Sequence, residues 1–287
     1  MSKKNVSNDP YSHADLPKIR NIFLYVYGCI MKNFAMIFFA LGGFILGILV
    51  FPFIRVFSLG SKKEFGVIAR AYVSHTFRWF LGFLNITGVS IRKVENRKSL
   101  REIHSKIIIA NHPSLLDFVY LMSLMPDSTC IVRGGLTKTP LRGVIKQAYI
   151  TNTTDFDTIL VECKKLTDKG CNVIVFPEGT RTPRHGHNNY KKGAARIALY
   201  CGCDVQPFFI GGSDKYGLGK HDPLWSYNHS EMYTYDIKRL PEIKVEDYKD
   251  LSEPIAAKRL TAKMEEVIKA AGDDYYANYT GRSRSNY

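Results

Sequence analysis

A histidine and an aspartate lie five positions apart directly after an apolar run. The run at residues 107–110 is short and β-branched, as in a buried strand, and His112 and Asp117 follow it. An imidazole can take a proton from a hydroxyl when a carboxylate orients its ring. The pair therefore predicts a general base at a strand end, where open α/β sheets bind ligands. The alternative is a loop histidine next to an aspartate that only favours a helix N-terminus.

The residues around this pair decide whether the two side chains can meet. Pro113 suits the first position of a helix, because its missing N–H would be unpaired there. Residues five apart lie about 140° apart around an ideal helix, so His112 and Asp117 cannot share a helical face. If His112 precedes the first turn, its ring can lie back over the helix start and contact Asp117. The N–H groups at that start are one possible set of donors to an oxyanion.

A second polar segment follows another apolar run. Residues 172–176 predict a buried strand, and after it come Glu178, Gly179, Thr180 and Arg181. Gly179 allows a sharp turn, whose N–H groups are the other possible oxyanion donors. Arg181 can hold a phosphate through two parallel N–H bonds, and Thr180 adds a hydroxyl donor. Glu178 can orient Arg181 or bind a substrate hydroxyl; the alternative is an ion pair of little energetic value at the surface.

These segments resemble motifs of the lysophospholipid acyltransferases of the 1-acyl-glycerol-3-phosphate acyltransferase type. The family's N-H-x4-D motif corresponds to Asn111–Asp117, and its F-P-E-G-T-R motif to Phe176–Arg181. Its basic K-x-P-x-x-G loop is similar to residues 133–143, and its apolar run with a proline to residues 205–210. The resemblance covers residues 70–240 approximately, with the motifs in the family's order.

The resemblance implies transfer of a fatty acyl group from an acyl-CoA or acyl carrier protein thioester to the free hydroxyl of 1-acyl-glycerol-3-phosphate or a similar lysophospholipid. His112 would act as the general base and Asp117 would fix its tautomer, without a covalent acyl-enzyme. Ser114 lacks the G-x-S-x-G setting of a catalytic serine. Neither a cofactor nor a metal is implied. The residues expected to bind the acceptor phosphate or headgroup are Glu178, Gly179, Thr180, Arg181, Lys138 and Arg133.

One stretch departs from the family pattern. Many members continue the second motif to an Asp-Arg pair whose arginine helps to hold the phosphate, whereas residues 149–154 read Tyr-Ile-Thr-Asn-Thr-Thr. Four cations can compensate, namely Arg133, Lys138, Arg142 and Lys146. The sequence also resembles a bacterial branch associated with aryl-polyene or similar lipids. Two alternatives stay open: an acyltransferase for another amphiphile, such as a glycolipid or aryl-polyene-type lipid, and a non-catalytic membrane-binding protein of the same fold.

The N-terminal region contains a long apolar stretch. Residues 34–54 carry no charge, and a bilayer core takes about 20 apolar residues. No small-residue cleavage site follows, which disfavours a secretory signal peptide. The stretch predicts either a spanning helix or an interfacial hairpin, with bends at Gly42-Gly43, Gly47 or Pro52. Positive charge flanks it on both sides, so the positive-inside rule gives no clean orientation.

Part of the net charge of +14 lies next to this stretch, because residues 55–106 contain 11 Lys and Arg against 3 Glu. A basic region beside an apolar anchor points to anionic lipid headgroups. Nucleic acid is disfavoured, since no binding motif accompanies the charge. We expect the inner (cytoplasmic) membrane as the location, with the active site facing the cytoplasm. The expected partners are membrane lipids, the lysophospholipid acceptor and the acyl-CoA or acyl carrier protein donor; the oligomeric state is open.

The remaining pattern predicts a single α/β domain with a mostly parallel or mixed sheet covered by helices. The aromatic residues within 77–84 fit either a helix core or the bilayer interface. The six cysteines form no C-x-x-C pair and are expected to be reduced thiols. The expected divisions are a polar tail at 1–20, a hydrophobic anchor at 21–60, the acyltransferase domain at 61–271 and a polar C-terminal tail at 272–287. Strands are expected at 107–110, 129–132, 148–151, 172–176, 205–211 and 231–238.

Overall fold

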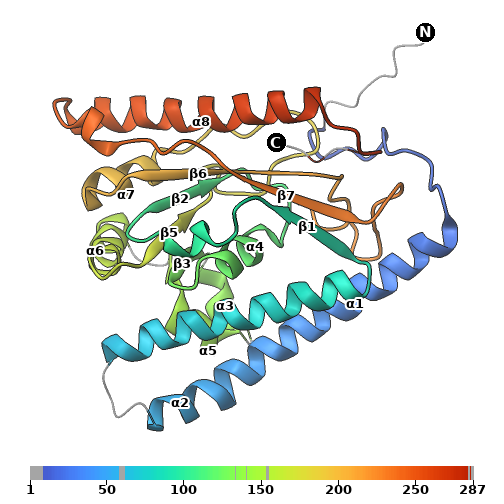
Figure 1. Ribbon diagram of the computed structural model, residues 1–287, viewed down its shortest axis with the longest axis horizontal. Coiled ribbons are helices and arrows are strands. Elements are labelled where there is room, and N and C mark those ends of the chain that lie inside the picture. Colours follow the sequence, from blue (N-terminus) through green and yellow to red (C-terminus); the bar gives the residue numbers. More distant parts are fainter. Residues whose placement is uncertain are drawn as a thin grey trace.

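A seven-stranded sheet with helices on both faces forms the centre of the protein (Figure 1). The computed structural model describes residues 9–57, 62–132, 134–139, 141–152, 155–283 and 285. The strands are β1 (Ser90–Val94), β2 (Ile107–Ala110), β3 (Ser128–Val132), β4 (Ile150–Thr151), β5 (Asn172–Val175), β6 (Val205–Gly211) and β7 (Tyr233–Arg239).

The sheet is mixed, as the sequence predicts. Its order is β1-β7-β6-β2-β5-β3-β4, and all neighbouring pairs are parallel except the antiparallel pair of β6 and β7. The sequence pattern missed β1, because Arg92 and Lys93 interrupt its apolar residues. An edge strand tolerates such charges, since part of it faces solvent.

The centre of the sheet sets the position of both polar motifs. All residues of β2 are fully buried, which explains their β-branched and small side chains. β2 lies between β5 and β6, and Ile109 of β2 is in register with Val175 of β5. Because the two strands are parallel, their carboxyl ends meet at one edge. The segments that begin at Asn111 and Phe176 therefore start side by side.

Helices cover the two faces of the sheet and form two separate cores. The first face is covered mainly by the N-terminal helices and α4, and the second by α6, α7 and α8, as Figure 1 shows. The helices are α1 (Ile22–Ile45), η1 (Leu46–Val50), α2 (Phe51–Phe57), α3 (Lys62–Ile86), η2 (Ser99–Glu102), α4 (Asp117–Leu124), η3 (Gly134–Lys138), α5 (Arg142–Ala148), α6 (Phe156–Thr167), α7 (Gly193–Cys201), η4 (Val245–Tyr248) and α8 (Glu253–Ala277).

The N-terminal apolar segment is one continuous helix from Ile22 to Phe57, long and apolar enough to cross a membrane by length and composition. A hairpin confined to residues 21–60 is therefore wrong; the helix instead lies beside α3 through aromatic contacts such as Phe39 with Phe77. At η1 the helix is π-helical, and the N–H of Phe51 bonds to the carbonyl of Leu46. Pro52 follows and has no N–H to donate, which explains the altered hydrogen bonding.

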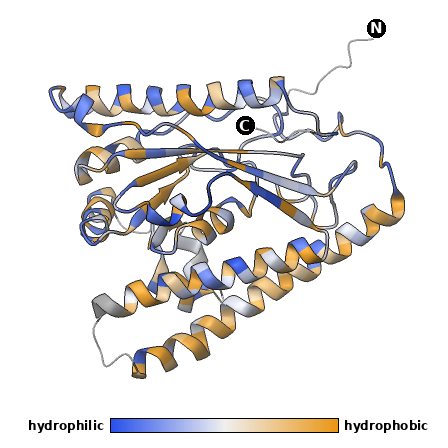
Figure 2. Cartoon of the chain, in the orientation of Figure 1, coloured by the Kyte–Doolittle hydropathy of each residue, from blue (hydrophilic) through white to orange (hydrophobic). Residues whose placement is uncertain are grey.

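Much of this helix is not covered by the rest of the protein, and Figure 2 shows it apolar along most of its length. Its exposed side chains include Phe23, Ile37 and Phe53. In α3, by contrast, Phe77 and Phe80 are core residues, and Trp79 is 72% exposed. The aromatic group at 77–84 is thus divided between the core and the surface.

The C-terminal helix extends further than its pattern suggests. α8 runs to Ala277, past residue 271, where the acyltransferase domain was expected to end. The hydroxyl of Tyr276 donates to the carbonyl of Gly212 at 3.0 Å, and the N–H of Ser285 donates to the same carbonyl at 2.9 Å. The segment expected to be a polar tail is therefore partly helical, because its tyrosines pack and bond against the end of β6. Residues 284, 286 and 287 lie outside the described residues.

Candidate active site

His112 is fixed at the carboxyl end of β2 by its neighbour Asn111. The buried amide of Asn111 donates to the carbonyl of Ile210 at 2.9 Å and accepts from the N–H of Ile210 at 2.8 Å. This paired bond ties the chain after β2 to strand β6. His112 therefore follows directly from a rigid attachment to the sheet.

His112 and Asp117 are in direct contact. Nδ1 of His112 lies 2.8 Å from Oδ2 of Asp117, whose side chain is completely buried. The imidazole stacks on the ring of Phe176 at 4.0 Å between ring centroids. A carboxylate at Nδ1 places the proton on that nitrogen and leaves Nε2 as the base. The helix begins at Asp117 rather than at Pro113, so His112 lies before the first turn and its ring can reach the carboxylate.

Ser114 supports the aspartate and is not placed as a nucleophile. It is fully buried, its N–H donates to Oδ2 of Asp117 at 2.7 Å, and its hydroxyl donates to Oδ1. The same hydroxyl lies 2.8 Å from the hydroxyl of Tyr235 on β7. These bonds use the serine side chain to hold Asp117.

Glu178 connects the two motif segments. It is 3% exposed, and its Oε1 accepts from the N–H of His112 at 3.1 Å and from the hydroxyl of Thr182 at 2.6 Å. Its Oε2 accepts from the amide of Asn188 at 2.8 Å. Burial raises the pKa of the Glu178 carboxyl, while these hydrogen bonds oppose the rise. Glu178 thus holds the backbone of His112.

The turn after β5 presents Gly179, Thr180 and Arg181. Gly179 has a φ of +67°, a left-handed conformation that favours glycine, and is exposed. A methyl group built there would lie 2.9 Å from Nζ of Lys191, so this lysine lies against the turn. Nη1 of Arg181 donates to the carbonyls of Leu218 and Gly219 at 2.9 and 2.7 Å. Arg181 therefore also ties the turn to the loop after β6.

The backbone N–H groups at these two segments differ in their availability. The N–H groups of Ser114, Leu115 and Leu116 all donate within the protein, to Asp117, Leu218 and Ser114 respectively. The N–H of Gly179 donates to the carbonyl of Phe176 at 2.9 Å. Among the described residues, the N–H of Thr180 has no hydrogen-bond partner. The turn after β5 therefore presents an unused donor, whereas the three residues after Pro113 do not.

The second motif lies further from these contacts. Lys138 ends η3 and is exposed, and Arg133 lies outside the described residues. Asn152, in the stretch that departs from the family pattern, accepts from the N–H of Gly134 at 2.9 Å. It therefore supports the loop backbone. Arg142 and Lys146 line a groove of about 510 Å³ together with Arg55 of α2.

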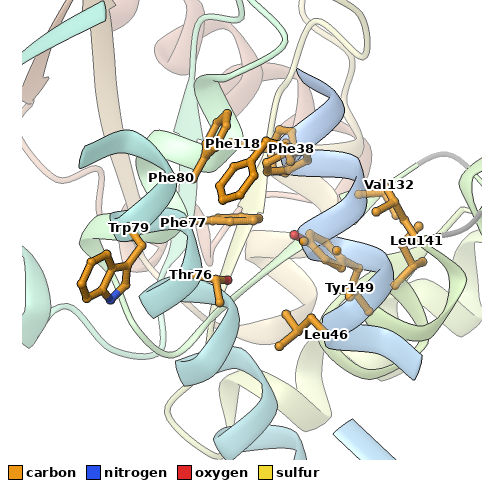
Figure 3. A pocket seen from close by; sticks show the side chains of 15 residues that line it. Phe38, Leu46, Thr76, Phe77, Trp79, Phe80, Phe118, Val132, Leu141 and Tyr149 are labelled. Carbon is orange, nitrogen blue, oxygen red and sulfur yellow. The ribbon is translucent and has the colours of Figure 1, made fainter. Parts of the chain in front are cut away.

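An apolar cavity of about 260 Å³ lies between the N-terminal helices and α5. Phe118, the residue that follows Asp117 in α4, lines the cavity (Figure 3). Figure 3 shows Phe77 and Tyr149 turned toward the same space. The lining comes from α1, α3, α4, α5 and the end of β3, namely Phe38, Phe39, Gly42, Gly43, Leu46, Thr76, Phe77, Trp79, Phe80, Phe118, Val132, Leu141, Val144, Ile145 and Tyr149.

Three residues of this site were missed by the sequence patterns: Asn188, Lys215 and Tyr235. Asn188 lies in a polar, glycine-containing loop, and Tyr235 belongs to a predicted strand. Each reaches the site only because β6, β7 and the loops after β5 and β6 converge beside β2. No local spacing could have selected them.

Comparison with known proteins agrees with this arrangement. A family model described as Acyltransferase matches residues 91–211. The chloroplastic 1-acyl-sn-glycerol-3-phosphate acyltransferase LPAT1 of Arabidopsis thaliana is 28% identical over 205 residues, 69% of this chain and 53% of its own. The 1-acyl-sn-glycerol-3-phosphate acyltransferase of Helicobacter pylori is 29% identical over 177 residues, 54% of this chain and 69% of its own. This chain thus spans about half the length of the Arabidopsis relative.

A solved structure shares the fold. The 1-acyl-sn-glycerophosphate acyltransferase PlsC from Thermotoga maritima matches with a TM-score of 0.66 and 19% identity, over 88% of this chain and 98% of that one. The matched family domain contains both motifs, since it begins in β1 and ends with β6. Residues 91–211 therefore match the acyltransferase family, and the chain is similar to 1-acyl-sn-glycerol-3-phosphate acyltransferases.

Proposed function

We propose that this protein is a membrane-associated O-acyltransferase. It transfers a fatty acyl group from an acyl-CoA or acyl carrier protein thioester to the free hydroxyl of 1-acyl-glycerol-3-phosphate or a similar lysophospholipid. The observation that carries the proposal is the His112–Asp117 contact of 2.8 Å at a strand end, next to an apolar cavity. The names of the curated relatives support the acceptor class.

The proposed mechanism needs one base and no covalent enzyme intermediate. Nε2 of His112 takes the proton of the acceptor hydroxyl, and the oxygen attacks the thioester carbonyl carbon. Asp117 stabilises the imidazolium that forms. The carbon–sulfur bond then breaks, and the proton on Nε2 passes to the leaving thiolate. The products are the ester and the free thiol of the donor.

The oxyanion on the thioester carbonyl is stabilised by the N–H of Thr180. This donor is unused among the described residues and follows the left-handed Gly179. Of the alternative donors after Pro113, the N–H groups of Ser114, Leu115 and Leu116 are engaged in hydrogen bonds within the protein. The turn after β5 is thus the better supported choice.

The acceptor phosphate binds at the same turn. Lys191 lies against Gly179, is exposed, and has no ion-pair partner among the residues that the structure describes. The Thr180 hydroxyl and the Arg181 guanidinium flank this position, and the bonds of Arg181 to Leu218 and Gly219 hold it in place. Lys138 and Arg133 are further cations proposed to face the acceptor headgroup. Lys191 and Arg181 supply the positive charge that binds a negatively charged phosphate monoester.

The acyl chain of the donor occupies the apolar cavity, and the N-terminal helix binds the membrane. Phe118 places one end of the cavity next to Asp117, so a chain inside it would present its thioester near His112. Phe38 of α1 is exposed and also lines the cavity, so lipid can enter beside it. We propose an inner-membrane location with this site on the cytoplasmic side.

A second candidate keeps the chemistry and changes the acceptor. Asn152 lies in the stretch where many family members carry an arginine for the phosphate, and its side chain bonds to the Gly134 backbone. An amphiphile without a phosphate, such as a glycolipid or an aryl-polyene-type lipid, would need no cation at this place.

The test is an acyl-transfer assay with purified protein in detergent micelles. The donors are acyl-CoA and acyl carrier protein thioesters, and the acceptors are lysophosphatidate, other lysophospholipids and phosphate-free amphiphiles. His112→Ala and Asp117→Asn are expected to lower kcat by roughly 100- to 10,000-fold with an unchanged circular dichroism spectrum. The control His187→Ala changes an exposed loop histidine and should leave the rate unchanged.

Two outcomes would contradict parts of the proposal. Rates close to those of the unchanged protein in both variants would exclude the His112–Asp117 mechanism. Transfer only to phosphate-free acceptors would replace the leading acceptor class by the second candidate.

A further inference from the structure

Lys215 is a buried cation that the proposed mechanism does not use. It follows β6 and is 3% exposed. Its Nζ donates to the carbonyls of Gly211, Ser213 and Thr234, with distances of 3.4 Å to Gly211 and 2.8 Å to Thr234. The ammonium lies 4.6 Å from the ring centroid of Tyr235. A lysine is almost never buried so completely without a specific reason.

Tyr235 connects this cation to the His112–Asp117 pair. The hydroxyl of Tyr235 is 2.8 Å from the hydroxyl of Ser114, which donates to Oδ1 of Asp117. Oδ2 of Asp117 contacts Nδ1 of His112. A continuous series of contacts therefore runs from the ammonium over the tyrosine ring to the imidazole.

Two buried opposite charges face one another through this series. Asp117 is fully buried, and among the described residues its ion-pair partner is the imidazole of His112 alone. Lys215 has no ion pair within that same part of the chain. A buried carboxylate without a nearby cation is strongly disfavoured. Apart from the imidazole of His112, neither group therefore has an oppositely charged side chain in direct contact among the described residues, and each supplies the opposite charge to the other through space.

The other charged groups near Lys215 are already paired. Asp214 forms an ion pair with Arg184 at 2.6 Å, and Glu231 accepts from the backbone N–H groups of Arg282 and Ser283. Burial lowers the pKa of Lys215 to about 7, whereas Asp117, and then Asp214 and Glu231, act to raise it. Asp117 is thus the carboxylate that raises the pKa of Lys215 most.

We propose that Lys215 is a positioning residue for the acyl transfer: protonated, it is the buried counter-charge of Asp117 and, through Tyr235 and Ser114, fixes the carboxylate that orients His112. The proposal depends on the proposed function. It assigns Lys215 no contact with substrate. Its effect is on the charge balance and geometry of the His112–Asp117 pair.

The test is the pH profile of kcat/KM from pH 5 to 8, measured with acyl-CoA and lysophosphatidate. The acid limb of this profile reports protonation of the catalytic base, and at pH values below its pKa of about 7 Lys215 carries its proton. Lys215→Met removes a positive charge near the His112–Asp117 pair. Without that charge, protonation of the base costs less free energy. The acid limb is therefore expected to move to higher pH by about one unit, and kcat to fall.

Lys32→Met is a matched control. Lys32 is 2% exposed, and its Nζ also donates to three carbonyls, those of Gly217, Leu224 and Ser226. No contact connects it to Asp117 in the described residues. Lys32→Met is expected to lower thermal stability and to leave the acid limb of the kcat/KM profile at the pH of the unchanged enzyme. An acid limb of Lys215→Met at the same pH as in the unchanged enzyme would overturn the proposal.

A second variant covers the case in which Lys215→Met does not fold. Tyr235→Phe keeps the ring beneath the ammonium and removes only the hydroxyl bonded to Ser114. We expect kcat to fall about tenfold at an unchanged acceptor KM. Unchanged kcat in Tyr235→Phe would also contradict the proposal. If the unchanged protein itself transfers no acyl group, the proposed function fails instead, so the two failures are distinguishable.

Discussion

At the scale of single residues, Glu178 is a motif side chain whose hydrogen bonds are made to other groups of the protein. Both of its carboxylate oxygens accept hydrogen bonds, and one of them holds the backbone N–H of His112. The bond connects the segment after β2 to the turn after β5. Glu178 therefore controls where the base lies relative to the turn that carries Gly179 and Thr180.

Glu178→Gln tests this role. The amide nitrogen of glutamine would face N–H and hydroxyl donors, so at least one of the bonds to His112, Thr182 and Asn188 would be lost. A shift of the base by about 1 Å can reduce the rate up to about 100-fold. We expect kcat to fall roughly 10- to 100-fold with a small change in acceptor KM, measured by steady-state kinetics. A raised acceptor KM at full kcat would indicate direct headgroup binding instead.

At the scale of elements, α5 packs directly against the N-terminal helix through two glycines. A methyl group on Gly143 would lie 2.7 Å from backbone atoms of Gly47 in η1. Side chains next to this contact, Leu46 and Val144, line the apolar cavity. The glycine that ends the family's second motif thus sets the distance between α5 and the N-terminal helix, and with it the cavity width.

Gly143→Ala is expected to separate these helices. Overpacking of this kind costs about 1–3 kcal/mol, which exceeds the gain in helix propensity from glycine to alanine, about 1 kcal/mol. We expect a lower thermal unfolding midpoint in detergent and altered relative rates for donors of different acyl-chain length. Gly82→Ala in α3 is the control, because a methyl group there meets nothing within 4 Å. Equal behaviour of the two variants would rule out the spacing role.

At the scale of the whole molecule, the apolar surface is unevenly distributed. The helix from Ile22 to Phe57 exposes apolar side chains along its length. It lies on the side of the sheet that also carries α3 (Figure 2), and Phe38 and Leu46 of this helix line the apolar cavity. α8 covers the opposite face. A membrane on the side of the N-terminal helix would bring acyl chains next to the cavity and leave α8 in water.

A triple variant tests this orientation, with Ile37→Asn, Leu49→Asn and Phe53→Asn. These side chains are 68%, 63% and 65% exposed, so the changes leave the core intact. Burial of each in lipid stabilises binding by about 1.5–3 kcal/mol. We expect at least about tenfold weaker binding to vesicles of phosphatidylcholine and phosphatidylglycerol, measured by flotation. Val161→Asn and Ile255→Asn, exposed on α6 and α8, should bind as the unchanged protein does; equal loss in both sets would refute the orientation.

The sequence by itself determined the features that depend on neighbouring residues. β-branched runs identified β2 and β5, and two motifs located His112 and Glu178 at their ends. An uncharged stretch identified the N-terminal helix, because a membrane-length apolar run has few other uses. Helix ends were less well determined. The start of α4 and the end of α8 depend on contacts to Ser114 and Gly212 that local propensity does not contain.

Only the tertiary structure decided how these features work together. It showed that Ser114 supports Asp117, that Glu178 holds the backbone of His112, and that Arg181 ties two loops. It also placed Lys215 behind Tyr235, and Gly47 against Gly143. Each of these contacts joins residues brought together by the sheet order or by helix packing. A sequence read along the chain contains the side chains but not their distances, and hydrogen bonds and buried charges depend on those distances.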